Sequence, residues 1–401
     1  MAPRKTKTIQ IEKFRCLRQK KKSKTEYRSW SDLPTEILEY IMSGLYLNDI
    51  TTFHSICKRW RSIEFPPIQQ LISYHPPLNH HQHHHHHHHH QIPWLMRSNS
   101  NYGQLTSSSE LIAPSSTKNK KSYSIKIEGI EGPADDKTQL CSIKFGWLLL
   151  SRTHSGSDCV STTSFFLYSP FINRRIDLPD LNSKFDVATF SSLPTSPDCV
   201  FFVLCCFPDK VNISTCRQGE MVWSSKSFSG GDGFSPIKDV VYLKKKFYCS
   251  NIRGGLATFD VDQQSWSVLS EPMVIMNAPV ISYSNSFLVG DEDDGELFFV
   301  LICSSGWVLV HKLDRSEMNW IKVHNLQDKS LFLSSSSTSI VISKNKRTKW
   351  VKMNRIYYCL PGEAPRFYSF KAGRNYKSTS HYGDVRFREF PENYFWIEPP
   401  Y

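Results

Sequence analysis

The sequence predicts an α+β chain with two folded parts: a small all-α module near the N-terminus and, behind it, an all-β propeller of about six blades. Apolar residues recur at helical spacing between residues 30 and 64. Short runs of β-branched and aromatic residues, separated by turn residues, fill the chain from residue 122 onward. In that region a pattern of glycine, aspartate and tryptophan recurs at roughly 40 to 50 residues, the spacing of propeller blades.

Residues 1–29 are predicted to form a basic, disordered tail. Of the formal net charge of +12, residues 1–28 carry +9, from 7 Lys and 4 Arg against 2 Glu. The positive charge therefore belongs to a tail and does not predict specific nucleic-acid binding by a domain face. Three roles stay open for it: a nuclear-import signal centred on Lys20-Lys21-Lys22, a weak contact with a polyanion, or a solvated arm.

Residues 30–74 are predicted to form the helical module. Pro34 suits the first turn of a helix, and Asp32 and Glu36 favour the positive end of the helix dipole. The first helix has one apolar face, formed by Ile37, Leu38, Ile41, Met42 and Leu45. After a capping signal at Asn48-Asp49, a second apolar stripe consists of Ile50, Phe53, Cys57 and Trp60. A unit of fewer than about 40 residues rarely stabilises its own core, so the module is expected to dock onto another surface.

The order of residues in this module resembles an F-box. The similarity covers Leu33-Pro34, Glu36-Ile37-Leu38, Asp49-Ile50 and the run Ser55-Ile56-Cys57-Lys58-Arg59-Trp60-Arg61. An F-box implies binding to the Skp adaptor of a cullin-RING ubiquitin ligase. The alternative is a helical hairpin that packs only on its own domain. The resemblance implies an adaptor-binding patch formed by Leu33, Pro34, Ile37, Leu38, Ile41, Ile50 and Trp60.

Residues 75–121 are predicted to be a low-complexity linker rich in His and Ser. Ten of the 16 histidines lie between His80 and His90. Such a tract buries no apolar area, so we expect disorder. Dense imidazoles bind zinc, nickel or copper in the test tube, but no acidic or cysteine ligand nearby fixes a geometry. We therefore predict a linker and no dedicated metal site.

Residues 122–401 are predicted to form the propeller and to bind the target. Gly146-Trp147 and Gly306-Trp307 each open a strand, and we expect the same local setting for both. Two units repeat a strand, a turn, a strand ending in Asp and a Trp that begins the next strand. The first has Gly254-Gly255, Asp260 and Trp266, and the second has Gly306, Asp314 and Trp320. Both units resemble degenerate kelch blades.

Together the two parts resemble a large group of plant F-box proteins with a C-terminal kelch-like propeller. The likeness is carried by FFLYSPFINRRIDLPDL at residues 165–181, by IKDVVYLKKKFYCSNIRGGLATFD at 237–260 and by the terminal FWIEPP at 395–400. In that family the propeller is where the ligase target is thought to bind. Nothing in these residues names the target.

Composition points to an intracellular protein, expected in the nucleus, the cytoplasm or both. No run approaches the 18 or so apolar residues that span a bilayer, and the N-terminus lacks the apolar segment of a signal peptide. The 11 cysteines include no C-x-x-C pair. Most lie among β-branched or aromatic residues, which favours buried thiols over a disulfide framework. The thiols predicted to be buried are Cys199, Cys205, Cys249, Cys303 and Cys359.

Motifs for catalysis are absent from the sequence: no phosphate-binding loop, dinucleotide fingerprint, nucleophile elbow or H-E-x-x-H occurs. Residues 291–296, DEDDGE, have the wrong register for a calcium loop and predict an acidic hairpin tip. The isolated histidines are predicted to be structural, although a propeller axis could gather them as copper ligands. They are His154, His311, His324 and His381. Aromatic and basic residues at 366–387 are assigned to the blade core in preference to a binding surface.

The sequence thus predicts a non-enzymatic substrate-recognition subunit of an SCF-type (Skp–cullin–F-box) ubiquitin ligase. Its expected partners are a Skp-family adaptor, through it a cullin and a RING protein, and an unknown target on the propeller. No catalytic residue, cofactor, metal, membrane or specific nucleic acid is predicted. The alternatives are a ligase-independent propeller scaffold and a propeller metalloenzyme.

Overall fold

The computed structural model describes residues 30–63 apart from 44, 46 and 47, and most of residues 92–399. Within the second range it leaves out 100–104, 106–107, 115–121, 128–129, 131–137, 156–160, 230–235, 270–284, 304–305, 336–337, 345–350 and 378–391. The predicted basic tail and the histidine tract both lie outside the described residues.

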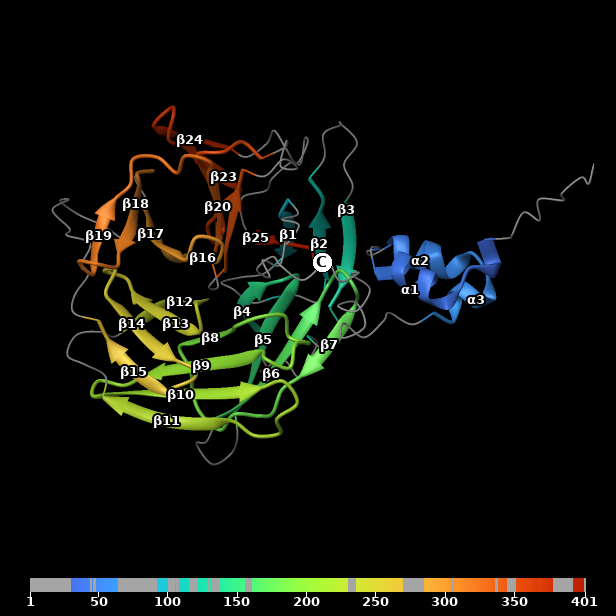
Figure 1. Cartoon of the computed structure of the whole chain (residues 1–401), viewed down its shortest axis with the longest axis horizontal. Coiled ribbons are helices and arrows are strands. Elements are labelled where there is room, and N and C mark those ends of the chain that lie inside the picture. Colours follow the sequence, from blue (N-terminus) through green and yellow to red (C-terminus); the bar gives the residue numbers. More distant parts are fainter. Residues whose placement is uncertain are drawn as a thin grey trace, which may run out of the picture.

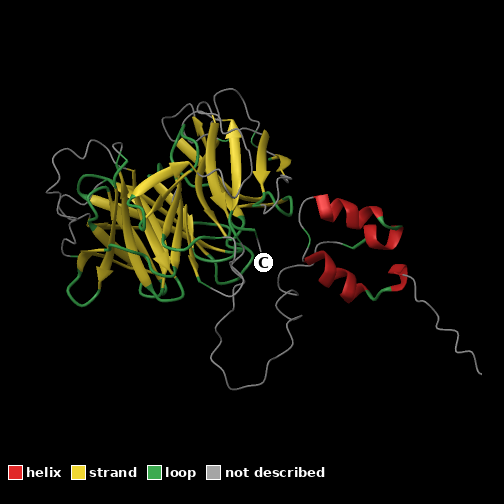
Figure 2. Ribbon diagram, turned by 90° about the horizontal axis from the view of Figure 1, so that it is seen from above, coloured by secondary structure: helices red, strands yellow, loops and turns green. Residues whose placement is uncertain are grey.

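The helical module consists of a 3-10 turn and three short helices. These are η1 (Trp30–Asp32), α1 (Thr35–Ser43), α2 (Asn48–Ser55) and α3 (Lys58–Arg61). The helices lie to one side of the strands in both views of the molecule (Figures 1 and 2). Their buried residues form a hydrophobic cluster of their own, separate from the clusters of the β domain. The predicted small all-α part is confirmed.

The described part of the β domain contains 25 strands in six sheets, and four of these sheets follow the chain directly. One contains β4 (Thr138–Lys144), β5 (Trp147–Ser155), β6 (Ser161–Ser169) and β7 (Arg174–Asp177). The next contains β8 (Val187–Phe190), β9 (Val200–Cys206), β10 (Lys210–Arg217) and β11 (Ser224–Ser229). Then come β12 (Ile237–Leu243), β13 (Lys246–Asn251), β14 (Leu256–Asp260) and β15 (Ser265–Val268). The fourth contains β16 (Asn285–Asp291), β17 (Glu296–Ile302), β18 (Val308–Asp314) and β19 (Asn319–Lys322).

The two remaining sheets depart from this simple order. One has five strands in the order β21-β20-β22-β23-β24, and its β20 and β22 are parallel. Its members are β20 (Lys329–Ser334), β21 (Thr338–Ser343), β22 (Arg355–Cys359), β23 (Arg366–Ser369) and β24 (Arg374–Lys377). The other joins both ends of the domain in the order β25-β1-β2-β3. It contains β1 (Trp94–Asn99), β2 (Ser108–Ile112), β3 (Ser122–Lys126) and β25 (Glu392–Ile397).

The innermost strands close a ring, which makes the domain a six-bladed propeller. Contacts run from β4 to β8, β12, β16, β21 and β25 in turn, and β25 contacts β4 again (Figure 1). Closure covers the apolar sheet faces that the first and last blades of an open array would expose. The predicted propeller of about six blades is confirmed.

Small polar side chains tie neighbouring inner strands together. The hydroxyls of Ser142 on β4 and Thr189 on β8 lie 3.2 Å apart, and Asp239 on β12 accepts the backbone N–H of Leu288 on β16 at 2.8 Å. At the closing blade, the N–H of Phe145 donates to the carboxylate of Glu398 at 2.7 Å. Buried polar groups need hydrogen-bond partners, so these contacts fix the positions of adjacent blades relative to one another.

The first blade starts earlier than the sequence indicates. Strands β1 and β2 fall inside the predicted linker 75–121, yet β1 pairs in register with β25, Trp94 opposite Ile397. The propeller therefore begins near residue 92, and the boundary at 122 is wrong. These strands are short and partly polar, and the partner that defines β1 lies some 300 residues further along the chain.

The two Gly-Trp pairs are not in the same setting. Gly146-Trp147 lies at the tight β4–β5 turn, where Phe145 and Gly146 both have positive φ, and Trp147 is fully buried. Gly306-Trp307 lies at the β17–β18 turn, between the second and third strands, and Trp307 is 71 % exposed. The expected equivalence is wrong, because the two turns occupy different places in their blades.

The repeated Asp and Trp positions are equivalent, as predicted. Asp260 ends β14 and Asp314 ends β18, the third strands of consecutive blades. Each carboxylate accepts backbone N–H groups of the following turn, from Gln263 at 2.9 Å and from Ser316 at 2.9 Å. These side chains stabilise the turn that leads into the fourth strand.

Aromatic residues fill the space between the sheets. Phe202 and Phe247 stack with ring centroids 4.3 Å apart across two blades, and Phe332 stacks on Tyr357 at 4.5 Å. Phe367, in the aromatic and basic region at 366–387, is buried, as predicted for blade core. Residues 378–387 of that region lie outside the described residues.

Candidate adaptor-binding site

The first helix of the module starts at the Leu33-Pro34 pair. The carbonyl of Pro34 accepts the N–H groups of Ile37 and Leu38, each at 3.1 Å, so Pro34 immediately precedes the first helical residue, Thr35. Glu36 in the first turn complements the helix dipole. The chain therefore enters α1 at a fixed point, and that point sets which side chains of α1 face the other helices.

A small core holds the three helices together. It consists of the buried residues Leu38, Met42, Phe53, Trp60 and Ile63. The rings of Phe53 and Trp60 lie 4.6 Å apart between centroids. Because Trp60 is the largest member and comes from the shortest helix, it fixes α3 against the other two.

Hydrogen bonds from α3 fix the turn that precedes α1. The indole N–H of Trp60 donates to the carbonyl of Trp30 at 3.2 Å, and Arg59 Nη1 donates to the carbonyl of Ser31 at 3.3 Å. The specific C-K-R-W-R sequence therefore closes the module by joining its last helix to its first residues.

The seven predicted adaptor-binding residues fall into three groups. Leu38 and Trp60 are core residues, with exposed fractions of 0 % and 6 %, so neither presents its side chain to a partner here. Helical spacing alone does not separate a buried stripe from an adjacent exposed one, so the sequence did not distinguish these two core residues, and their contact with an adaptor stays a prediction. Pro34 and Ile37 are exposed, and the half-buried residues are Leu33, Ile41 and Ile50.

An exposed apolar strip runs along one side of α1. Pro34, Ile37 and Tyr40 follow one another at intervals of three residues, close to one helical turn. Ile37 is 45 % exposed and Tyr40 is 58 % exposed. Leu38 and Met42, four residues apart, form the neighbouring buried side. We call Pro34, Ile37 and Tyr40 the α1 strip.

Three exposed apolar residues of the module were missed by the sequence interpretation. They are Tyr40 in the α1 strip, Trp30, which is 74 % exposed, and Ile56, which is 52 % exposed. Tyr40 could have been found from its spacing to Ile37. No sequence signal near Trp30 predicts its exposure. Its backbone carbonyl accepts the hydrogen bond from Trp60, and its side chain remains exposed.

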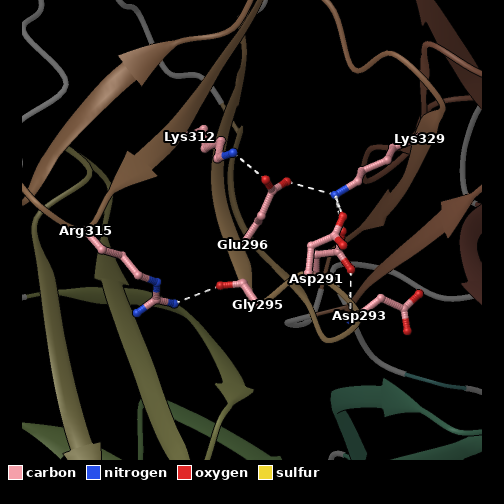
Figure 3. A network of polar contacts seen from close by, with 8 residues as sticks. Asp291, Asp293, Gly295, Glu296, Lys312, Arg315 and Lys329 are labelled. Atoms are coloured by element: carbon pink, nitrogen blue, oxygen red, sulfur yellow. Dashed lines mark hydrogen bonds and ion pairs between the residues drawn. The ribbon is translucent and has the colours of Figure 1, made fainter. Parts of the chain in front are cut away.

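The propeller carries a charged network where the sequence predicts an acidic hairpin tip. Lys329, on β20, reaches across to the neighbouring blade and binds three carboxylates of the β16–β17 hairpin (Figure 3). Its Nζ lies 2.6 Å from Asp291, 2.5 Å from Asp294 and 2.8 Å from Glu296. Glu296 also pairs with Lys312. We call Lys329 and its three carboxylates the lysine cluster.

A lysine ammonium occupies the centre of these carboxylates, so the group does not fit a metal ion. Burial disfavours the charged form of Lys329, but its hydrogen bonds to the three carboxylates outweigh that effect and raise its pKa. The hydrogen bond from Lys329 lowers the pKa of Asp294. Burial opposes ionisation of Glu296, yet the bonds from Lys312 and Lys329 lower its pKa as well.

We expect the lysine cluster to make the stability of the propeller depend on pH. The pKa values of Asp294 and Glu296 are lowered on folding, so the unfolded chain binds protons more tightly. Their contribution is complete above the ordinary carboxyl pKa of about 4 and is lost as the pH falls below it. Urea denaturation between about pH 3 and pH 7 measures this loss. A Glu296→Gln variant should show a shallower decline, and an unchanged decline would contradict the assignment.

The described histidines of the propeller lie in two blades, and most of the thiols predicted to be buried are buried. His154 lies on β5, whereas His311 and His324 belong to the blade of β18 and β19; His381 lies outside the described residues. Burial and the nearby Lys322 lower the pKa of His311.

Four of the five thiols predicted to be buried are buried, and Cys303 is half-buried. The four buried thiols are Cys199, Cys205, Cys249 and Cys359. Burial raises the pKa of Cys205 to about 11, which keeps its thiol unreactive.

The helical module and the closed propeller define an F-box protein with a C-terminal β-propeller. The chain belongs to the KIB1-4 beta-propeller family, whose sequence model matches residues 111–382, and an F-box domain model matches residues 30–64. Several F-box proteins of the plant Arabidopsis thaliana match it, and the predicted likeness to plant F-box proteins with kelch-like propellers is confirmed. Among the described residues, no helix is both long and apolar enough to cross a membrane.

Two Arabidopsis thaliana proteins illustrate the relationship. The F-box/kelch-repeat protein At1g57790 is 26 % identical over 92 % of this chain and 95 % of its own length. The F-box protein At4g00893 is 26 % identical over 82 % of this chain and 76 % of its own length. Among solved structures, TolB from Acinetobacter baumannii aligns with a TM-score of 0.37 and 12 % identity, over 71 % of this chain and 62 % of that one.

Proposed function

We propose that this chain is the substrate-recognition subunit of an SCF-type ubiquitin ligase. In this role the F-box binds a Skp-family adaptor, which connects it to a cullin and a RING protein, and the propeller holds the target. The chain contributes binding and positioning, and the bond-making chemistry belongs to other subunits. Holding a target beside a reactive partner raises its effective concentration, which by itself accelerates transfer.

The α1 strip is the observation that carries this proposal. The module has its own core, and Pro34, Ile37 and Tyr40 lie outside that core. Exposed apolar side chains grouped on one helix face gain about 25 cal/mol for each Å² that a partner covers. Side chains on a folded helix also lose little further freedom on binding. The α1 strip therefore suits the adaptor contact that an F-box implies.

We expect Ile37→Asp to weaken capture of a Skp-family adaptor. A carboxylate at the centre of the α1 strip would have to be desolvated in the complex, which weakens binding by about tenfold or more. Ile37 is 45 % exposed, so the module should stay folded. Titration of purified adaptor against the full chain measures the affinity.

Thr51→Asp is the matched control, because Thr51 is exposed on α2 and takes the same charge. It should capture the adaptor as the natural chain does. Normal capture by Ile37→Asp would refute the role of the α1 strip. If the natural chain recovers neither adaptor nor cullin from plant extract, a ligase-independent scaffold is the better explanation.

A further inference from the structure

Three consecutive blades expose an apolar side chain at the same turn, the one between the second and third strands. Phe207 follows β9 and is 38 % exposed, Ile252 follows β13 and is 49 % exposed, and Trp307 precedes β18 and is 71 % exposed. Successive strands within these blades are antiparallel, so the three turns lie at the same end of the propeller. The exposure is therefore a repeated feature of one face.

The turn that carries Ile252 is rigid. The side-chain oxygen of Asn251, which is buried, accepts the N–H groups of Arg253 at 2.9 Å and Gly255 at 2.8 Å. A Cβ at Gly255 would lie 2.6 Å from the Asn251 amide, so only glycine fits there. With the inside of the turn filled by Asn251, Ile252 and Arg253 are held outward.

The turns that carry Ile252 and Trp307 each also accept a hydrogen bond from a side chain on the outer strand of the next blade. Trp320 on β19 donates its indole N–H to the carbonyl of Gly254 at 2.7 Å. In the same way, Asn375 on β24 donates to the carbonyl of Gly306, next to Trp307. The repetition of this contact fixes the positions of Ile252 and Trp307 relative to the blades that follow them.

Exposed cations accompany the apolar side chains. Lys210 Nζ lies 5.4 Å from the centroid of the Phe207 ring, and Arg253 follows Ile252. One acid, Asp209, lies in the first turn. We call this face the turn surface; it consists of Phe207, Lys210, Ile252, Arg253 and Trp307.

We propose that the turn surface docks an acidic segment of the target protein that carries apolar or aromatic side chains. The inference rests on the proposed function, since it names the chemical class of target that the propeller would deliver. Charge complementarity selects the occupant: two of the five turn-surface residues, Lys210 and Arg253, are cations, and carboxylates between apolar anchors would pair with them. Tryptophan and arginine are also the residues that most often dominate protein interfaces.

Rigidity makes the turn surface suitable for this task. A partner gains the most from anchors that are already fixed, because little conformational freedom is lost when it binds. The Asn251 contacts and the two fastening hydrogen bonds supply that order before any partner arrives. Trp307 is the largest exposed anchor, so its loss should weaken binding most.

The test uses the purified full chain and an array of short random-sequence peptides. We expect the retained peptides to be enriched in Asp or Glu together with Phe, Trp, Leu or Ile. Trp307→Ala should weaken the best of them by about tenfold or more, and Arg253→Glu should discriminate against the acidic ones. Binding should also weaken as salt is raised. Both substituted side chains are exposed, so the melting temperature should not change.

Met221→Ala is the matched control, because Met221 is 83 % exposed but lies at the turn between the third and fourth strands, at the other end of its blade. It should leave peptide binding unchanged. Retained peptides without acidic and apolar enrichment, or equal binding by Trp307→Ala, would overturn the proposal. So would Trp307-dependent binding of single-stranded RNA in place of peptides. The peptide measurement does not require adaptor capture. A failure of adaptor capture would therefore contradict the proposed function and leave the peptide result unaffected.

Discussion

Replacement of Trp60 by Ala is expected to unfold the F-box while the propeller remains folded. Trp60 is 6 % exposed, packs on Phe53 and binds the carbonyl of Trp30. Truncating a buried tryptophan costs about 3 to 5 kcal/mol. A unit of this size has little stability to spare, so the loss should exceed what holds its helices together.

Hydrogen exchange followed by mass spectrometry measures this result segment by segment. In Trp60→Ala, peptides from residues 30–63 should lose protection, and those from the propeller strands should keep it. Ile56→Ala is the control, since Ile56 is 52 % exposed and its loss should leave protection intact. Unchanged protection in Trp60→Ala would show that Trp60 is not a core residue. The comparison also separates a structural role for Trp60 from the contact role of Ile37.

Replacement of Lys329 by Met is expected to destabilise the propeller by about 3 to 5 kcal/mol. Lys329 is the common partner of three carboxylates, and Asp291 among them is only 2 % exposed. Without the ammonium group, a buried carboxylate loses its counter-charge, which costs far more than an exposed ion pair contributes. The thermal midpoint should fall by about 5 °C or more.

Lys245→Met is the matched control for this loss. Lys245 pairs with Asp262, but the two side chains are 74 % and 59 % exposed, so water replaces the lost partner. Its thermal midpoint should stay near that of the natural chain. If Lys329→Met melts no lower than Lys245→Met, the lysine cluster does not stabilise the contact between its two blades.

Together these variants separate the two parts of the proposed function. Trp60→Ala should remove the proposed connection to the ligase by unfolding the F-box, and Ile37→Asp should remove it by changing an exposed face. Lys329→Met lowers the stability of the domain that would hold the target, and Trp307→Ala alters the face on which we expect the target to dock. A target that binds the turn surface should still be captured by Ile37→Asp but not ubiquitinated.

Local sequence was sufficient where neighbours along the chain determine structure. The turns at Asp260 and Asp314 follow from side chains that bind the N–H groups just after them. Runs of β-branched and aromatic residues between turn residues predicted most strands, because strands buried on both faces, such as β9 and β17, are apolar almost throughout. The F-box helices were likewise predicted from their spacing and caps.

Local sequence was insufficient where the partner is distant. Strand β1 is defined by β25 at the other end of the domain, and its own sequence, WLMRSN, has no strong pattern. The lysine at the centre of the acidic hairpin lies 33 residues beyond Glu296, in the next blade. Trp147 and Trp307 each follow a glycine, yet one is fully buried and the other is 71 % exposed.

The sequence by itself determined that this chain joins an F-box to a β-propeller, because helix spacing, strand patterning and short motifs are encoded by adjacent residues. Only the tertiary structure decided which residues of each part face outward. Ile37 and Leu38 are neighbours of similar hydrophobicity, and the packing of α2 and α3 covers one and leaves the other exposed. Whether a side chain is buried depends on which residues pack against it, and those residues come from other helices or strands.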